Sequence, residues 1–244
     1  MPAISNHVST SVVIPAYNEE EMLGATLESL TKQITSDPFE VIVVNNASTD
    51  RTREVAQQYQ GKLNLVVVDE PHKGRGAARA AGFDHAQGGI VFSTDADVII
   101  PPHWLSSLLA HLSDKSFAAV SGTCQVRDLS QLGNSTINTI QSVAMRAFAR
   151  VYGTPWLTGS NFAIRKEVYQ VSGGFDHKLT AFEDAELALR VKAHGRIKMI
   201  TDTPVVASGR RFAHHGLFKG IFSYVRFLNE YHVHNQHVTL ADPR

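Results

Sequence analysis

The sequence predicts an α/β fold in which helices flank a mainly parallel central sheet. Four short apolar runs in the first half indicate buried strands, at Val12–Ile14, Val41–Val44, Leu63–Val68 and Ile90–Phe92. Segments with helical spacing or composition lie between these runs. Because two parallel strands can be joined only by a connection about as long as a helix, the alternation favours a doubly wound, mainly parallel sheet.

The composition is that of an ordinary globular protein. The chain has 244 residues, 43% of them hydrophobic, which suits one large domain spanning residues 1–244. Lysine plus arginine equals aspartate plus glutamate, at 23 each, which argues against nucleic acid as a partner. The single cysteine, Cys124, excludes an internal disulfide framework and favours a reducing, cytoplasmic compartment. We also expect no signal peptide and no membrane span.

The first half is expected to alternate strand and helix in order. Pro15 ends the first apolar run, and Asn18 is predicted to cap a helix with Glu19–Glu21 near its positive end. That helix has an apolar residue at each turn, at Leu23, Leu27, Leu30 and Ile34. A polar turn at 45–49, a helix at 50–59 and a small-residue-rich helix at 74–87 complete this half.

The second half is less regular. The His194-Gly195 pair is expected to end a helix that starts at Glu183. The expected elements are, in order, a strand at Ala118–Val126, a helix at Ile137–Tyr152, a turn-rich segment at Gly153–Asn161, a helix at Glu183–Ala193, strands at Ile197–Ile200 and Val205–Ala207, and a helix over Leu217–His232 with its apolar stripe at Leu217, Ile221, Val225 and Leu228.

Two aspartates stand where the fourth apolar run stops, in the sequence Asp95-Ala96-Asp97. In open α/β sheets the ends of the strands face the crevice where ligands bind. Carboxylates there can hold Mg²⁺ or Mn²⁺, and through the metal a diphosphate leaving group. Taken alone, an Asp-x-Asp is more often a polar loop whose aspartates cap a helix. The strand before it favours the metal site, but the spacing does not say whether Asp95 or Asp97 binds the metal directly.

Polar loops also follow the first two strands. If the sheet is parallel, loops 15–19 and 45–50 open on the same rim as Asp95. Tyr17 could lie against a base and Asn46 could hydrogen-bond the edge of that base, although ordinary turn chemistry explains both loops equally well.

The segment Lys73–Arg79 is rich in glycine, which lets a backbone approach a ligand closely. Arg79 can face a phosphate or the metal-binding carboxylates, and a structural ion pair is the alternative. The segment is neither a dinucleotide fingerprint nor a Walker loop, because it lacks the third glycine and any Gly-Lys-Ser/Thr.

Taken together, these pieces resemble the family-two glycosyltransferases, which have the GT-A fold. The resemblance runs from about Ser11 to about Arg211 and rests on the order of its pieces, since each piece is weak alone. The matching pieces are Val13–Glu19, Asn46–Asp50, Gly76–Gly82, Asp95–Asp97, Thr158–Asn161, Gly173–Asp176, Phe182–Leu187 and Arg190.

The resemblance implies transfer of a sugar from a nucleotide-sugar to an acceptor hydroxyl, usually with inversion at the anomeric carbon. Residues of about 10–100 would form the nucleotide-sugar-binding half, about 101–212 the acceptor and catalytic half, and 213–244 a helical tail. The donor would be held by Pro15, Tyr17, Glu19, Asn46, Arg79, Asp95, Ala96 and Asp97 with Mn²⁺ or Mg²⁺, and the acceptor by Gly159, Ser160 and Asn161. The family commonly has aspartate where Asn46 stands, which leaves the base preference open, because an amide can donate as well as accept.

Glu183 and Asp184 resemble the catalytic pair of the family, and Asp184 matches its general base. The reaction asks for one carboxylate that takes the proton of the acceptor hydroxyl. The residues alone allow a plainer interpretation, in which both acids stabilise the start of a helix.

The end of the chain supplies further candidates. Arg210 and Arg211 resemble a diphosphate-contacting segment of some members, although a solvated basic turn is equally open. The segment departs from the Gln-x-x-Arg-Trp pattern of processive synthases, which argues against a processive enzyme. His214 or His215 could complete the metal shell, but an incidental histidine pair is favoured.

The final helix has two interpretations. Packing on the core is favoured. Alternatively, its aromatic and basic residues attach the protein to the inner face of a membrane and so to a lipid-linked acceptor; a carbohydrate acceptor is the other option.

Two further functions compete with glycosyl transfer. Haloacid-dehalogenase-type phosphatases also place an Asp-x-Asp after an apolar strand, and Asp95 would then be phosphorylated. That strand is normally the first of the domain, whereas three strands are predicted before it here. A non-catalytic module that binds nucleotide-sugars is the second alternative, and the presence of Asp95, Asp97 and Asp184 argues against it.

Overall fold

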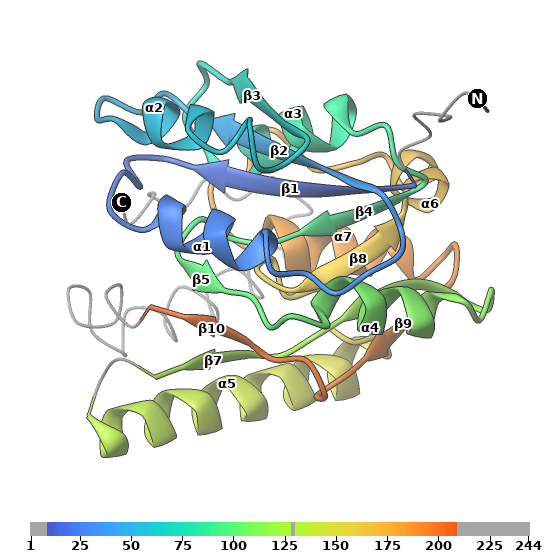
Figure 1. Ribbon diagram of the computed structural model, residues 1–244. Coiled ribbons are helices and arrows are strands. Elements are labelled where there is room, and N and C mark those ends of the chain that lie inside the picture. The colour runs from blue at the N-terminus through green and yellow to red at the C-terminus, as the bar shows by residue number, and fades with distance from the viewer. Residues whose placement is uncertain (1–8, 128–129, 209–244) are drawn as a thin grey trace.

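In the computed structural model, residues 9–127 and 130–208 are described. A seven-stranded sheet in the order β3-β2-β1-β4-β8-β6-β9 forms the centre (Figure 1). β1 to β4 run parallel, β6 and β9 are parallel to each other, and β8 is antiparallel to both of its neighbours, β4 and β6. The predicted mainly parallel α/β fold is confirmed. The strands are β1 (Thr10–Ala16), β2 (Phe39–Asn45), β3 (Leu65–Asp69), β4 (Ile90–Ser93), β6 (Phe117–Ser121), β8 (Phe162–Arg165) and β9 (Arg196–Met199).

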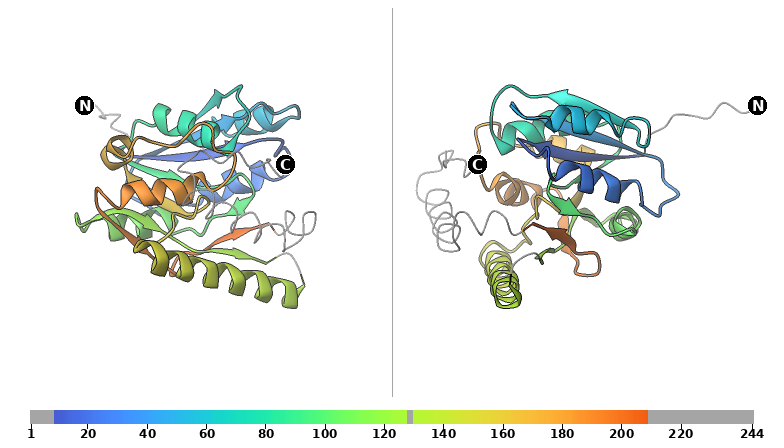
Figure 2. Two further views of the ribbon diagram at one scale, coloured as in Figure 1. Left: turned by 180° about the vertical axis from the view of Figure 1, so that it is seen from behind. Right: turned by 60° about the vertical axis from the view of Figure 1, so that its left-hand side comes forward.

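Helices cover both faces of this sheet (Figure 2). Alternate residues of a strand point to opposite faces, so Val12 and Ile14 pack with α1, α2 and α4 while Val13 packs with α3, α6 and α7. Strands buried on both faces need apolar residues at every position, which explains the continuous apolar runs. The helices are α1 (Leu23–Leu30), α2 (Thr52–Gln57), α3 (Arg75–His85), α4 (Trp104–Leu112), α6 (Lys166–Val171) and α7 (Glu183–Val191).

A second, three-stranded sheet in the order β5-β10-β7 lies beside the main one, with the long helix α5 (Gln131–Tyr152) along its outer edge (Figure 1). Asn138 of α5 attaches the helix to β7, since its side chain accepts from the N–H of Val126 at 3.0 Å and donates to the carbonyl of Val126 at 3.2 Å. The strands are β5 (Val98–Ile99), β7 (Cys124–Val126) and β10 (Val205–Ala207).

The single strand predicted at Ala118–Val126 is wrong. The chain forms two strands there, β6 in the main sheet and β7 in the second sheet. They separate at Gly122, where a Cβ atom would lie 2.3 Å from Nδ2 of Asn161. The separation coincides with Ser121-Gly122-Thr123, a polar, glycine-containing break in the apolar pattern that was a usable turn signal. β8 and α4 were also not predicted.

The predicted helix cap at Asn18 is wrong as well. α1 begins at Leu23, and no side chain caps it. Asn18 has a positive φ of 51° and accepts a hydrogen bond from the N–H of Thr49 at 2.8 Å. A contact between the loops after β1 and β2 therefore replaces the local cap.

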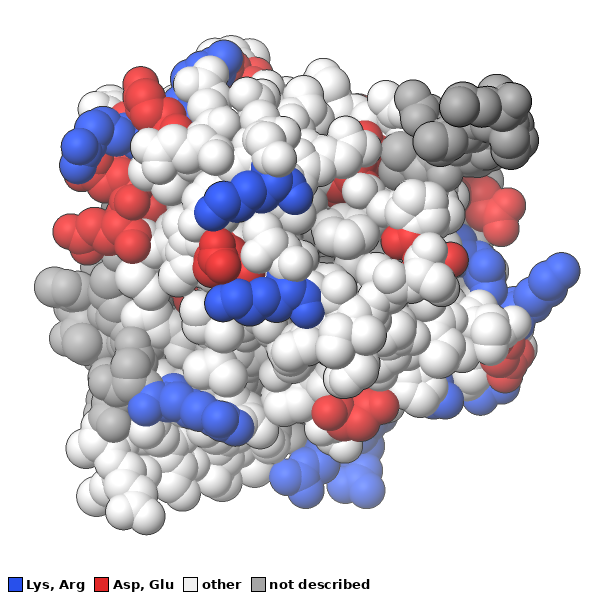
Figure 3. Space-filling view, viewed as in Figure 1, with Lys and Arg blue, Asp and Glu red and all other residues white. Residues whose placement is uncertain are grey.

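The surface seen in Figure 3 mixes acidic and basic side chains without one large field of a single sign. Glu28, for example, pairs with both Lys32 and Lys62. Within residues 9–127 and 130–208, no helix has the length and apolar character needed to cross a bilayer.

Candidate active site

Loops attached to four strands meet at one rim of the main sheet. The parallel strands β1, β2 and β4 end there, at Ala16, Asn45 and Ser93. β8 runs the other way, and its first residue, Phe162, pairs with Ser93. The loops after β1, β2 and β4 and the loop before β8 therefore share this rim, which we call the carboxyl rim. Ligands of open α/β sheets bind at such a rim.

Arg79 of α3 is buried at the carboxyl rim and pairs with two carboxylates. Its Nη2 donates to Oδ1 of Asp95 at 2.8 Å, and its Nε donates to Oε1 of Glu183 at 3.0 Å. Only 4% of the Arg79 side chain and 3% of the Glu183 side chain are exposed. Burial alone would lower the pKa of Arg79, but the charges of Asp95 and Glu183 outweigh it and hold that pKa above its ordinary value. The permanent positive charge of Arg79 thus holds the carboxylates of Asp95 and Glu183 together.

Asp184 lies beside this network in the first turn of α7. Its Oδ2 accepts from the backbone N–H of Gly159 at 2.7 Å, and its Oδ1 accepts from the N–H of Ala185 at 2.8 Å. Burial, followed by the charge of Glu183, raises the pKa of Asp184 to about 6, although Arg79 and the two N–H groups oppose the shift. A carboxylate with a pKa this close to neutrality is suited to accept a proton.

Gly159 lets the backbone pass close to Arg79 and Asp184. A Cβ atom at this position would lie 2.5 Å from Nη2 of Arg79 and 2.9 Å from Oδ2 of Asp184. The hydroxyl of Ser93 donates to the carbonyl of Gly159 at 2.8 Å and so attaches the loop to the end of β4. Only glycine leaves room for this N–H to reach the carboxylate.

Both ends of the Asn46 side-chain amide hydrogen-bond the loop between β3 and α3. Its Nδ2 donates to the carbonyls of Glu70 and His72 at 3.1 and 2.8 Å, and its Oδ1 accepts from the N–H of Gly74 at 2.9 Å. Both ends of the amide are satisfied, and the residue is buried. Asn46 therefore holds loop 70–74 in place, whereas its contact with a base stays a prediction.

Loop 70–74 reaches the loop after β1. Nζ of Lys73 lies 4.0 Å from the centre of the Tyr17 ring, in cation–π contact. Pro15 and Glu19, on either side of Tyr17, are buried. Tyr17 itself is partly exposed, so its ring lies at the edge of the rim.

Asn161 and Ser160 are held by the protein on the interior side of the rim. Oδ1 of Asn161 accepts from Nε1 of Trp104 at 2.7 Å, and its Nδ2 donates to the carbonyls of Thr123 and Thr203 at 2.8 and 3.0 Å. Ser160 hydrogen-bonds the thiol of Cys124. Residues 159–161 thus form a fixed junction between the two sheets, and their role in acceptor binding stays a prediction.

Comparison with known proteins identifies the family of the chain. The profile of glycosyl transferase family 2 matches residues 11–173, which include β2, β4 and β8 of the carboxyl rim and end before α7. The chain belongs to glycosyl transferase family 2. The predicted family is confirmed.

Relatives in family 2 agree with this assignment. The chain is 30% identical over 195 residues to the probable glycosyltransferase YdaM of Bacillus subtilis, which covers 74% of this chain and 46% of the relative. It is 29% identical over 229 residues to validoxylamine A glucosyltransferase of Streptomyces hygroscopicus subsp. limoneus, covering 80% and 50%. The chain spans about half the length of the curated relatives it matches.

A solved structure shows the same fold. The mannosyltransferase PcManGT of Pyrobaculum calidifontis, in complex with GDP-Man and Mn²⁺, superimposes with a TM-score of 0.71 at 26% identity. The match covers 90% of this chain and 61% of that chain. The predicted GT-A fold is confirmed.

The Asp-x-Asp of this family 2 protein lies in the turn between β4 and β5. Asp97 and Ala96 are buried, whereas one fifth of the Asp95 side chain is exposed. The carbonyl of Ala96 accepts from Oγ1 of Thr26 at 2.8 Å, which fixes the turn against α1.

Several predicted residues lie outside the described residues. They are Arg210, Arg211, His214, His215 and the helix predicted at 217–232. Two residues that support the site were missed in the sequence, Ser93 and Trp104. Ser93 precedes the Asp-x-Asp by two positions, which was a usable signal, but no local pattern connects Trp104 with Asn161.

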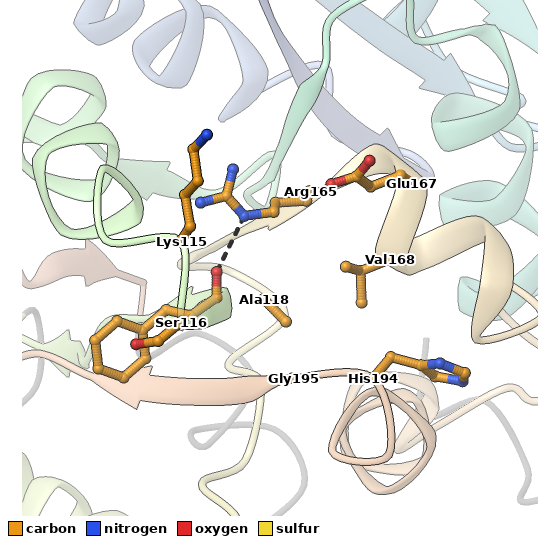
Figure 4. Close-up of a pocket in the computed structure, with 9 residues that line it drawn as sticks. Lys115, Ser116, Ala118, Arg165, Glu167, Val168, His194 and Gly195 are labelled. Carbon is orange, nitrogen blue, oxygen red and sulfur yellow. Dashed lines mark hydrogen bonds between the residues drawn. The ribbon is translucent and has the colours of Figure 1, made fainter.

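A cavity of about 480 Å³ lies at the opposite end of the sheet, which we call the amino rim. The registers place Arg165, at the end of β8, and Phe117, at the start of β6, there. Arg165 donates to the carbonyl of Phe117 at 3.1 Å, the hydrogen bond marked by the dashed line in Figure 4, and to the carbonyl of Leu112 at 2.5 Å. Lys115 lies beside Arg165 in this view, and His194 lies apart from both. The cavity contains none of the predicted site residues.

Proposed function

We propose that the protein is a metal-dependent, inverting glycosyltransferase that moves a sugar from a nucleoside-diphosphate sugar to an acceptor hydroxyl. The observation that carries the proposal is Asp184, a carboxylate with a pKa of about 6 that Glu183 and Arg79 link to Asp95. A proton acceptor and a donor-anchoring carboxylate on one rim are what a direct displacement requires.

Asp184 acts as the general base in this proposal. It takes the proton of the acceptor hydroxyl while the hydroxyl oxygen bonds to the anomeric carbon. The bond from that carbon to the diphosphate oxygen breaks, and its electron pair leaves with the nucleoside diphosphate. Attack from the side opposite the leaving group inverts the anomeric centre. Proton transfer of this kind contributes ~10²–10⁴ to the rate.

Mn²⁺ or Mg²⁺ fits the donor atoms of Asp95 and Asp97, because hard cations prefer carboxylate oxygens. Among residues 9–127 and 130–208, no group of three or more histidines, cysteines or acids is arranged to hold a metal. The two aspartates would therefore supply part of the shell, and diphosphate and water the remainder, as is usual for Mg²⁺. When bound, the metal would neutralise charge on the departing nucleotide.

The remaining predicted residues take supporting roles in the proposal. Pro15, Tyr17, Glu19 and Asn46 hold the nucleoside, within a donor half of about residues 10–100. Gly159 contributes to the binding of a carbohydrate or lipid-linked acceptor beside Asp184, and the buried Ser160 and Asn161 hold its loop in place, within an acceptor half of about 101–212.

The phosphatase alternative has no support in the fold. The strand before Asp95 is the fourth of the chain, and the Asp95 carboxylate pairs with Arg79. A phosphorylated aspartate would be expected after the first strand and free to attack.

A thermal-shift panel of UDP-, GDP- and dTDP-sugars, with and without Mn²⁺, tests the donor and the metal. A donor at 100 times its Kd stabilises the fold by ~2.7 kcal/mol, which corresponds to several degrees in Tm for a chain of this size. We expect one nucleotide to respond, and only with the metal. No response to any donor would refute the proposal.

Asp184→Asn tests the base and excludes a non-catalytic module. We expect the release of nucleoside diphosphate to fall by ~10²–10⁴. Binding of the same nucleotide with Mn²⁺, measured by calorimetry, should stay as in the wild type. Unchanged turnover in this variant would remove Asp184 from the reaction.

A further inference from the structure

All three nitrogens of the Arg79 guanidinium contact other residues of the protein. Nη2 donates to Asp95, Nε donates to Glu183, and Nη1 lies 3.4 Å from Oγ of Ser93. With 4% of its side chain exposed, the group presents little surface to a ligand. Of the two contacts that the sequence allowed for Arg79, a phosphate or the metal-binding carboxylates, the structure shows the second, with Asp95.

The two carboxylates on Arg79 come from distant parts of the chain. Asp95 follows β4, on the side of the proposed donor site, and Glu183 begins α7, which carries Asp184. Arg79 and Glu183 are 104 residues apart in the sequence. A planar fork of donors holds two carboxylates in a fixed geometry, whereas the ammonium of a lysine, on its flexible stem, fixes their relative placement less well.

We propose that Arg79 is a positioning residue whose buried guanidinium ties Asp95 to Glu183 and thereby sets the place of Asp184 relative to the donor. The proposal rests on the proposed function, in which Asp184 is the base and Asp95 anchors the donor. Arg79 touches no reacting atom in this scheme. It acts through the two carboxylates that it holds.

The charges of the residues in this network also set the pKa of Asp184. Three acids, Asp95, Glu183 and Asp184, surround the single charge of Arg79. Arg79 lowers the pKa of Asp184 and Glu183 raises it, and the N–H groups of Gly159 and Ala185 also lower it. Glu183 therefore acts on Asp184 through its charge, and a change at either partner must shift the titration of Asp184 in a known direction.

The titration of Asp184 tests the network without any substrate. Protein labelled with ¹³C at its aspartate carboxyls is titrated by NMR, and Asp184→Asn identifies the resonance. We expect a pKa of about 6 in the wild type. Glu183→Gln should lower that pKa, because it removes a negative charge and keeps the side-chain size. Arg79→Gln should raise it, and Arg79→Lys should shift it less.

Kinetic and binding measurements then show whether Arg79 positions Asp184 or contacts the donor. In Arg79→Lys we expect kcat for nucleoside diphosphate release to fall by ~10²-fold, since a displacement of 1 Å can cost that much. The Kd for UDP or GDP with Mn²⁺ should change less than about threefold. A Kd weakened tenfold or more, with the Asp184 titration unchanged, would instead assign Arg79 to the diphosphate and overturn the proposal.

Arg190→Lys is the matched control. Arg190 lies in α7, as Asp184 does, and makes an ion pair with Glu186 at 2.5 Å. We expect a lower Tm and no shift in the titration of Asp184. If Arg79→Gln does not fold, Glu183→Gln still tests whether neighbouring charge shifts the pKa of Asp184. An unchanged pKa of Asp184 in Glu183→Gln would overturn that charge effect.

Failure of the proposed function is distinguishable from failure of this inference. Normal turnover in Asp184→Asn would remove the general base, whatever the titrations give. Loss of turnover in Asp184→Asn with no titration shift in the Arg79 and Glu183 variants would keep the base and overturn the network.

Discussion

The two rims of the main sheet hold their charged side chains in different ways. At the carboxyl rim, Arg79 pairs with both Asp95 and Glu183, and the side chains of Arg79 and Glu183 are almost fully buried. At the amino rim, Lys115 is exposed, and Arg165 bonds to backbone carbonyls instead of an acid. A cavity of about 480 Å³ lies at the amino rim, and coupled charges lie at the carboxyl rim.

This difference predicts how each rim responds to a substitution. Buried charges are stable only when they are paired, so a change to one member of the carboxyl-rim network must disturb the others. An exposed side chain at the amino rim interacts mainly with water, and its removal should have a local effect. Variants at the two rims can therefore be compared directly.

The largest effect is expected from Gly159→Ala. Its added Cβ would lie within 3 Å of Arg79 and Asp184, so one of them must move. We expect kcat to fall by ~10²-fold or more with the fold retained, measured by nucleoside diphosphate release and circular dichroism. Gly89→Ala, at the other end of β4, is the control, because nothing lies within 4 Å of its added atom. Equal rates for the two variants would contradict the role of this close approach.

The pH dependence of turnover should follow Asp184. A base must be ionised, so with a pKa of about 6 the value of kcat/KM should fall below pH 6 and approach a tenfold loss per pH unit. The fold should not be lost in the same range through this group. Its pKa is raised above 3.8, so its protonation as pH falls from about 6 toward 4 stabilises the native state.

Rates measured from pH 5 to 8, with intrinsic fluorescence as a check on folding, decide this prediction. A flat profile across pH 6 would contradict it.

Asn46→Asp should have a moderate effect. A carboxylate would face the carbonyls of Glu70 and His72 and lose two hydrogen bonds. We expect a loss of about 1–3 kcal/mol in the free energy of unfolding, measured in urea, together with weaker nucleotide binding. Asn64→Asp makes the same change at an exposed position and is the control. Wild-type stability in Asn46→Asp would show that the amide is not needed to hold loop 70–74.

The smallest effect is expected from Lys115→Ala at the amino rim. Stability should stay within about 0.5 kcal/mol of the wild type, because surface substitutions away from special features are usually that mild. Turnover should be unchanged within experimental error. A marked loss of turnover would mean that the amino rim contributes to function and would break the contrast between the rims.

Much of the first half of the chain could be predicted from the sequence. The apolar runs before Asn18, Asn46 and Asp95 are local signals, and the alternation with helices places their ends on one rim. Prediction failed where a residue has a non-local partner. Asn18 was expected to cap α1 but accepts from Thr49, and the strand predicted across Gly122 is divided between two sheets, with Gly122 close to the Asn161 side chain.

The sequence could not show which residues the acidic side chains pair with. Asp184 was identified by resemblance, but its raised pKa depends on burial and on Glu183, Arg79 and Gly159, which three separate segments bring together. Strand periodicity is a local property, so it predicts where polar groups emerge from the sheet. Desolvation and charge pairing depend on distances between segments far apart in the chain, and only the tertiary structure sets those distances.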